Sequence, residues 1–262
     1  MMNTQDQERT LIIQPRRVLF FLAGAEIILI ILSLIGQYLR LFPGSYSIHS
    51  LFQEKLLRDF IALFDVNSES NMTSYYSVSM AIVSSFLLFV IASLKIAARD
   101  RYRFYWAALA GLLLYISMDD ASVIHEKISK YMKGWSAMGG WFEYKWVIAG
   151  IVVVGVLAIA FLRFWLHLDN KYKVLSLLSA GMFFGGAVGT EILSGRWAYS
   201  HGVKNFPYVL LNTFEQGLQY GGLILLIYSL LLYLKSYFPR FAVSTKGSLE
   251  GVETRSRREK KP

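Results

Sequence analysis

The chain alternates long apolar runs with short polar segments, and this pattern predicts membrane-spanning helices. A helix of about 20 apolar residues crosses the hydrocarbon layer of a bilayer. Six stretches of the sequence have this length and character. We expect spans near residues 18–39, 74–97, 104–121, 146–166, 174–194 and 207–234.

The segment between the first two spans has a different pattern. Apolar residues recur about one helical turn apart from Ile48 to Leu63, and charged residues lie between them. This spacing is typical of an amphipathic helix that lies in the plane of the membrane surface. We therefore expect an interfacial helix near residues 48–64, on the outer side.

Composition supports the membrane interpretation. Charged residues make up 17% of the 262 residues, whereas an average soluble domain has about 25%. A mean hydropathy of +0.41 leaves more apolar surface than a single core can bury. Soluble, disordered and collagen-like classes are excluded. The predicted fold is an all-α integral membrane protein, with one polytopic domain over residues 1–235 and a basic tail over residues 236–262.

The distribution of charge predicts the orientation. Most of the 27 Lys and Arg residues fall on the side that holds both termini, and most of the 18 Asp and Glu residues lie elsewhere. Cytoplasmic loops are enriched in Lys and Arg, so we expect both termini in the cytoplasm and the protein in a bacterial plasma membrane. The basic tail is more typical of a topology signal or of contact with anionic lipid than of nucleic-acid binding.

Ionisable residues inside spans are costly and are functional candidates. The outer half of the predicted bundle holds Asp119, Asp120, Glu191 and Glu215, whereas Glu26 lies nearer the inner half. If the third helix continues outward, Asp119, Ser122 and Glu126 share one face, His125 flanks that face, and Asp120 points about 100° away. Asn212, Glu215 and Gln219 form a second polar face, with Gln216 beside it.

Two spans carry packing signals. Gly181, Gly185 and Gly189 recur every four residues and predict a face that another helix approaches closely, with Glu191 on a different flank. The fourth span, near residues 146–166, has no polar side chain between Val147 and Leu162. We expect it at the periphery.

The carboxylates and imidazole suggest a metal centre. Because the chain has no cysteine, disulfides, thiolate-bound metals and iron–sulfur clusters are excluded. Oxygen and nitrogen ligands suit iron, zinc or manganese. The expected ligands or acid/base groups are Asp119, His125, Glu126, Glu191 and Glu215, with Asp120, Ser122, Asn212, Gln216 and Gln219 orienting them.

Three functions remain open at this point. The favoured one is a metal-binding membrane enzyme that acts on a lipid-like substrate; the alternatives are a proton- or ion-coupled transporter and a non-catalytic subunit of a larger complex or homo-oligomer. The Glu-x-x-His pairs of helical di-iron proteins are missing. A second histidine would have to come from His49 or His201, which we place in outer loops.

Three segments resemble an uncharacterised family of bacterial multi-pass membrane proteins: Phe64-Asp-Val-Asn-Ser-Glu69-Ser-Asn71-Met-Thr73-Ser-Tyr-Tyr-Ser77, Ser117-Met-Asp119-Asp120-Ala-Ser-Val-Ile-His125-Glu126 and Thr213-Phe-Glu215-Gln-Gly-Leu-Gln219-Tyr-Gly221. The resemblance implies a membrane protein of unknown activity and adds Glu69 and Asn71 to the candidate cluster. The family pattern has Glu at the positions of Asp120, Gln216 and Gln219, so this chain offers fewer ligands for a pair of metals.

Overall fold

The structure, a computed structural model, describes residues 14–45, 50–124, 127 and 146–238. Every regular element in these ranges is helical. The elements are α1 (Pro15–Leu41), η1 (Pro43–Ser45), α2 (Leu51–Phe64), α3 (Met72–Ala97), α4 (Arg103–Ser122), α6 (Trp146–His167), α7 (Asn170–Phe184), η3 (Gly185–Thr190), α8 (Glu191–His201) and α9 (Phe206–Tyr237).

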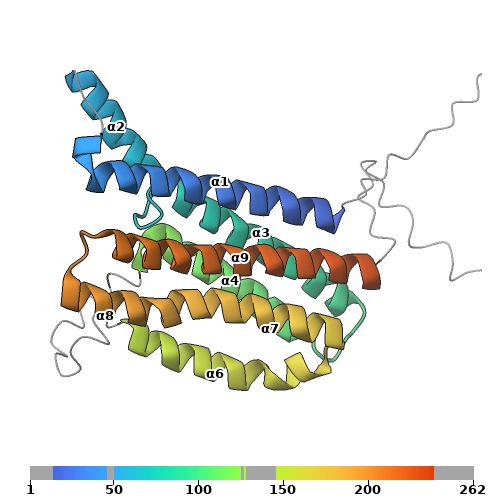
Figure 1. Ribbon diagram of the computed structural model, residues 1–262. Coiled ribbons are helices and arrows are strands. Elements are labelled where there is room, and N and C mark those ends of the chain that lie inside the picture. The colour runs from blue at the N-terminus through green and yellow to red at the C-terminus, as the bar shows by residue number, and fades with distance from the viewer. Residues whose placement is uncertain (1–13, 46–49, 125–126, 128–145, 239–262) are drawn as a thin grey trace, which may run out of the picture.

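The long helices lie side by side in a bundle, and α2 leans away from it (Figure 1). The helices alternate in direction, so α1 begins and α9 ends at the same end of the bundle, which we call the far end. The other end, where α1 leads into α2, is the α2 end. Helix α9 packs against α1, α3, α7, η3 and α8, and it is therefore the central helix.

Five helical segments are long and apolar enough to cross a membrane: Pro15–Leu41, Met72–Ala97, Val147–His167, Asn170–His201 and Phe206–Tyr237. The all-helical architecture of the described residues is thus confirmed, and these five candidate spans are consistent with a helical membrane protein. The third expected span, near residues 104–121, corresponds to α4, which packs along α3. Asp119 and Asp120 in its last turns make it less apolar than the other five, so its crossing of the membrane stays a prediction.

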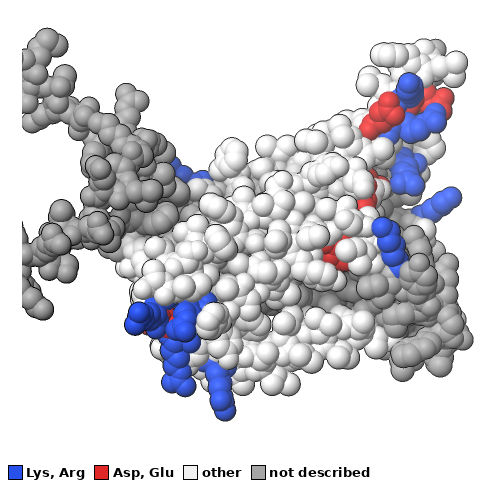
Figure 2. Space-filling view, turned by 180° about the vertical axis from the view of Figure 1, so that it is seen from behind, with Lys and Arg blue, Asp and Glu red and all other residues white. Residues whose placement is uncertain are grey.

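The surface divides into an uncharged belt and charged ends. Lys and Arg side chains gather at the two ends of the bundle, and the broad zone between them is largely uncharged (Figure 2). A few acidic atoms are visible inside that belt. The belt has the character of a lipid-facing surface.

Helix α6 lies at the edge of the bundle, as predicted. Only 11% of its span is buried, whereas half of the α9 span is buried. Its aromatic contacts lie toward the far end, where Phe164 meets Trp106 edge to face with ring centroids 5.0 Å apart.

The amphipathic segment near residues 48–64 is present as helix α2. Ser50 caps its first turn by accepting a hydrogen bond from the backbone N–H of Gln53 at 3.2 Å. None of its residues is buried, and Leu51 and Phe52 are 85% and 74% exposed. Its position on the membrane surface stays a prediction.

The fifth span is longer than expected. Instead of residues 174–194, a continuous helical segment runs from Asn170 to His201. It ends at Gly202, whose φ of +75° lies in the left-handed region that glycine adopts readily. His201, expected in a loop, therefore occupies the last turn of α8.

Close contact between α7–η3 and α9 involves other glycines than those predicted. A Cβ atom added at Gly222 would lie 2.8 Å from the backbone oxygen of Ser179 and 2.8 Å from the backbone nitrogen of Phe183. One added at Gly186 would lie 2.9 Å from the backbone oxygen of Glu215. The two helix backbones are thus in direct contact at both positions.

The prediction for Gly181, Gly185 and Gly189 was wrong. A Cβ atom at any of them would meet nothing within 4 Å. Residues 185–190 form a π-helical turn. Its wider turn changes which residues face α9, and Gly186 takes the contact position instead.

Gly222→Ala tests this contact, with Gly181→Ala as the matched control. We expect Gly222→Ala to destabilise the bundle by about 1–3 kcal/mol, because backbone atoms cannot yield to the added methyl group. Gly181→Ala should leave the thermal unfolding midpoint in detergent unchanged or slightly raised. Equal midpoints for both variants would contradict the packing.

Candidate functional site

A pocket of about 500 Å³ lies in the half of the bundle nearer the α2 end. The segment after α2, helices α3, α4, α6, α7, α8 and α9, and η3 all contribute to its walls. It joins elements that are far apart in the sequence. Its polar wall gathers most of the predicted site residues: Glu69, Asp119, Asp120, Glu191, Asn212, Glu215, Gln216 and Gln219.

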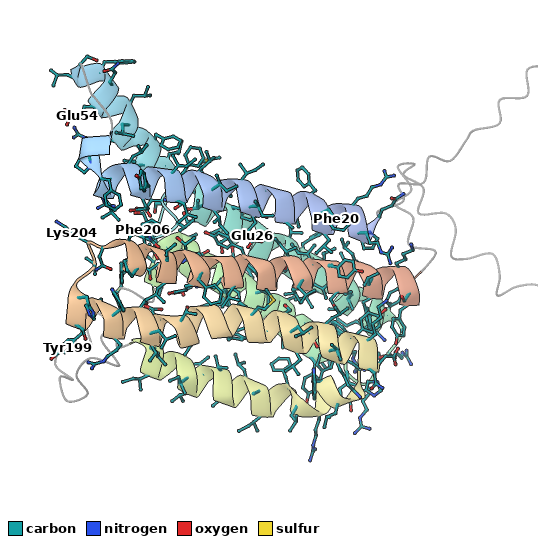
Figure 3. The ribbon with its side chains drawn as sticks, in the orientation of Figure 1. Phe20, Glu26, Glu54, Tyr199, Lys204 and Phe206 are labelled. Atoms are coloured by element: carbon teal, nitrogen blue, oxygen red, sulfur yellow. The ribbon has the colours of Figure 1, made fainter. Side chains whose placement is uncertain are left out.

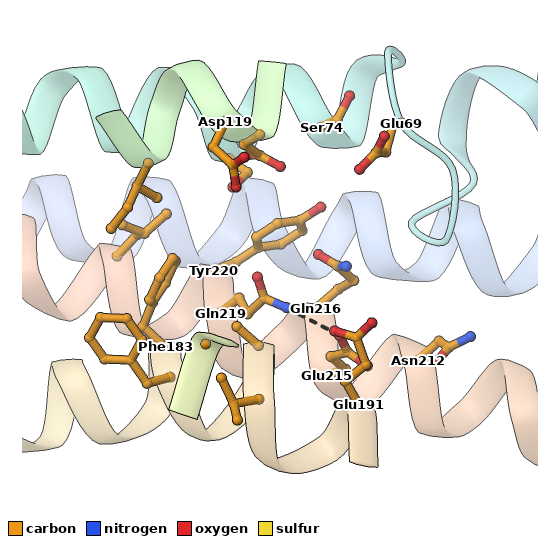
Figure 4. Close-up of a pocket in the computed structure, with 18 of the residues that line it drawn as sticks. Glu69, Ser74, Asp119, Phe183, Glu191, Asn212, Glu215, Gln216, Gln219 and Tyr220 are labelled. Carbon is orange, nitrogen blue, oxygen red and sulfur yellow. Dashed lines mark hydrogen bonds between the residues drawn. The ribbon is translucent and has the colours of Figure 1, made fainter. Parts of the chain in front are cut away.

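Glu215 lies deepest in this polar wall. The residue is 8% exposed, and its Oε1 accepts a hydrogen bond from Gln219 Nε2 at 3.4 Å. Glu191 lies beside it, close enough for the two charges to interact (Figure 4). The expectation that Glu191 points into a polar interior is borne out by this position. Asp119 lies on the opposite wall, and Tyr220 stands between the two groups.

The last turn of α4 differs from the prediction. Asp119 and Asp120 both line the pocket, although they lie about 100° apart on the helix, so the pocket reaches both sides of this turn. Ser122 is exposed and is not among the described lining residues.

Helix α4 also ends earlier than the spacing argument assumed. Val123 caps it in the left-handed conformation, with φ of 59°, which is unusual for a β-branched residue. The helical face that we predicted from Asp119 to Glu126 is therefore interrupted at Val123. His125 and Glu126 themselves lie outside the described residues, as does His49.

Acidic side chains predominate among the charged residues in the described lining of the pocket. Five carboxylate side chains line it, and none of its described lining residues is Lys, Arg or His. Within the described ranges, no group of three or more His, Asp or Glu side chains is arranged to hold a metal ion. The five-ligand metal centre thus stays a prediction, since two of its ligands fall outside those ranges.

Hydrogen bonds of the Asn71 side chain fix the segment that carries Glu69, and we call this set of bonds the Asn71 node. The Asn71 side chain caps α3, accepting hydrogen bonds from the backbone N–H groups of Thr73 and Ser74 at 3.1 Å each. Its Nδ2 donates to the carbonyl oxygens of Ala62 and Asp65 at 3.2 and 2.6 Å. The resemblance placed Asn71 in the candidate cluster, but these contacts make it a structural residue.

Sequence reasoning missed Tyr220 and the π-helical turn. Tyr220 lines the pocket, is 1% exposed, and donates its hydroxyl to the Thr73 carbonyl oxygen at 3.1 Å. In the sequence Tyr220 looks like one more apolar residue of the last predicted span, so the pattern gives little indication that it lines a pocket. The π-helical turn contributes Ala187 and Val188 to the wall, and such turns are frequent at functional sites.

Asn71→Ala tests the node. Loss of the cap and of the two hydrogen bonds that Asn71 Nδ2 donates should lower stability by about 2 kcal/mol, which we expect as a lower thermal unfolding midpoint in detergent. Asn67→Ala is the matched control, because this side chain is exposed in the same segment. An unchanged midpoint for Asn71→Ala would show that the node is not needed.

Comparisons with known proteins give a match to a protein family, which covers most of the chain. No curated protein and no solved structure matches it. One family model, described as a domain of unknown function (DUF8692), matches residues 19–234, which include all of the predicted spans except residue 18 and all described lining residues of the pocket. The expected membership of an uncharacterised family is thereby confirmed: the chain belongs to the DUF8692 family.

Proposed function

We propose that the protein binds a cation in the acidic pocket and moves it across the membrane as a proton- or ion-coupled transporter. The observation that carries this proposal is the set of five carboxylates around one pocket whose described lining has no basic residue. Carboxylates that share a low-dielectric site repel one another when ionised. Such a site is stabilised by bound protons or by a bound cation.

The size of the pocket indicates the kind of cation. Metal–oxygen bonds are about 2.0–2.6 Å long, so a bare ion would leave most of the 500 Å³ unfilled. An apolar wall of the pocket includes Ala149, Val153 and Val154 of α6. A hydrated divalent ion or an organic cation with an apolar part fits a pocket that has both acidic and apolar walls.

Coupling follows from competition at the carboxylates. A cation that enters displaces protons from them, and protons that return displace the cation. Proton release and cation binding are then two aspects of one equilibrium. We place the pocket on the outer side of a plasma membrane, following the distribution of Lys and Arg in the sequence.

A metal-dependent membrane enzyme is the second candidate. The observation that favours it is the same apolar wall, which suits the chain of a lipid-like substrate. Asp119, Glu191 and Glu215 would then hold iron, zinc or manganese, and His125 and Glu126 would complete the site. Metal bound in this way activates water or polarises an ester.

Cation binding to protein in lipid nanodiscs tests the proposal. We expect Mn²⁺, followed by electron paramagnetic resonance, or tetraphenylphosphonium, followed by calorimetry, to bind with release of protons. Glu215→Gln should weaken binding at least about tenfold, which corresponds to about 1.4 kcal/mol. Glu54→Gln is the control, because Glu54 is exposed on α2 and does not line the pocket.

The same preparations separate the two candidates. Proton-driven uptake of the bound probe into proteoliposomes, lost in Glu215→Gln, supports the transporter. Stoichiometric iron, zinc or manganese that survives purification and is lost in Glu215→Gln supports the enzyme instead. Absence of binding by both probes contradicts the cation pocket.

A further inference from the structure

The connection between α3 and α4 is rich in arginine. Its residues 99–103 are Arg-Asp-Arg-Tyr-Arg, and the last of them begins α4. The connection lies at the far end of the bundle (Figure 1), and Lys and Arg side chains gather at the ends of the bundle (Figure 2). Arg99 and Arg101 are exposed, and Arg103 is half-buried. We call residues 99–103 the arginine loop.

The carboxylate of Asp100 is used inside the arginine loop. It accepts a hydrogen bond from Lys95 Nζ at 3.0 Å, which is also an ion pair, and one from the backbone N–H of Tyr102 at 2.7 Å. The Asp100 carbonyl oxygen accepts a hydrogen bond from Arg103 Nη1 at 3.1 Å. Asp100 therefore fixes the shape of the loop and neutralises a lysine of α3. Within the described ranges, none of the three arginines forms an ion pair with a carboxylate.

Arg99 has a backbone conformation that is unusual for its residue type. Its φ of 52° lies in the left-handed region, which glycine adopts readily and other residues adopt seldom. Its N–H donates to the carbonyl oxygen of Ile96 at 3.0 Å, and the next N–H donates to that of Lys95 at 2.9 Å. Glycine is the usual residue at this position of such a helix end. An arginine that is kept there against the strain is a functional candidate.

Aromatic rings lie beside the other two arginines. The Arg101 guanidinium is 5.7 Å from the centroid of the Tyr102 ring, and the Arg103 guanidinium is 4.7 Å from that of Phe104. Phe104 itself is 66% exposed on α4. The loop directly follows the candidate span Met72–Ala97, so it lies at the level of lipid headgroups, where aromatic residues are enriched.

We propose that the arginine loop binds an anionic phospholipid of the leaflet at the far end. Guanidinium groups bind phosphate through charge-assisted hydrogen bonds, and those of Arg99 and Arg101 are exposed. The exposed ring of Phe104 offers apolar surface to the first part of an acyl chain.

Charge complementarity selects this partner. Basic clusters directly beside a membrane span are attracted to anionic headgroups, and Asp100 supplies no charge to the three arginines because Lys95 already pairs with it. The site goes beyond cation transport and does not depend on it, since the acidic pocket lies in the half of the bundle nearer the α2 end.

Native mass spectrometry of the protein in a neutral detergent tests the site. Phosphatidylglycerol and phosphatidylcholine with the same acyl chains are titrated, and the bound lipids are counted. Because hydrogen bonds to charged groups are strong, we expect phosphatidylglycerol to bind at least about tenfold more tightly. The double variant Arg99→Gln/Arg101→Gln should lose most of this preference.

Arg58→Gln/Lys204→Gln is the matched control. It also removes two positive charges, but both side chains are exposed and lie at the α2 end, where Figure 3 shows Lys204. The control should keep the preference for phosphatidylglycerol. Equal binding of both lipids by the unchanged protein, or an equal loss of preference in the two double variants, overturns the site.

Arg99→Gly separates lipid binding from folding. Glycine relieves the left-handed backbone, so the thermal unfolding midpoint without anionic lipid should stay unchanged or rise. Phosphatidylglycerol should bind this variant more weakly and therefore raise its midpoint less. A lowered midpoint without lipid, or undiminished binding, contradicts the proposed role of Arg99. Displacement of the lipid by an equal concentration of inorganic phosphate would show a site for free phosphate and overturn the proposal.

Discussion

The contact between the backbones of α7–η3 and α9 determines the rest of the structure. Lipid tails are as apolar as leucine side chains, so burial of apolar surface does not drive helices together inside a membrane. Close van der Waals contact and interhelical hydrogen bonds must do so. Gly186 and Gly222 allow that contact, and the Ser179 hydroxyl adds a hydrogen bond to the Gly222 carbonyl oxygen at 2.8 Å. Glu191 and Glu215 are brought side by side as a consequence.

The opposite wall of the pocket depends on a different kind of interaction. Asn71 joins the end of α2 to the start of α3 through hydrogen bonds, and Tyr220 joins the start of α3 to α9. In each of these bonds the side chain of Asn71 or Tyr220 pairs with a backbone group. Glycine contact on one side and polar capping on the other hold the carboxylates around a space that they do not fill.

The sequence predicted the features that depend on local pattern. Hydrophobic length identified the helices, and the rule that membrane ionisables are functional selected Asp119, Glu191 and Glu215, which line one pocket. Prediction from the sequence failed where a helix departs from 3.6 residues per turn or ends without a usual capping residue. The π-helical turn at 185–190 shifted the glycine contact to Gly186, and the left-handed Val123 ended α4 before Glu126.

The central position of α9 has a consequence for how the protein is made. Helices α1, α3 and α7 all pack on it, yet it follows every one of them in the chain. During synthesis these helices enter the membrane before the partner that joins them exists. The ribosome must therefore finish Phe206–Tyr237 before the acidic pocket can close.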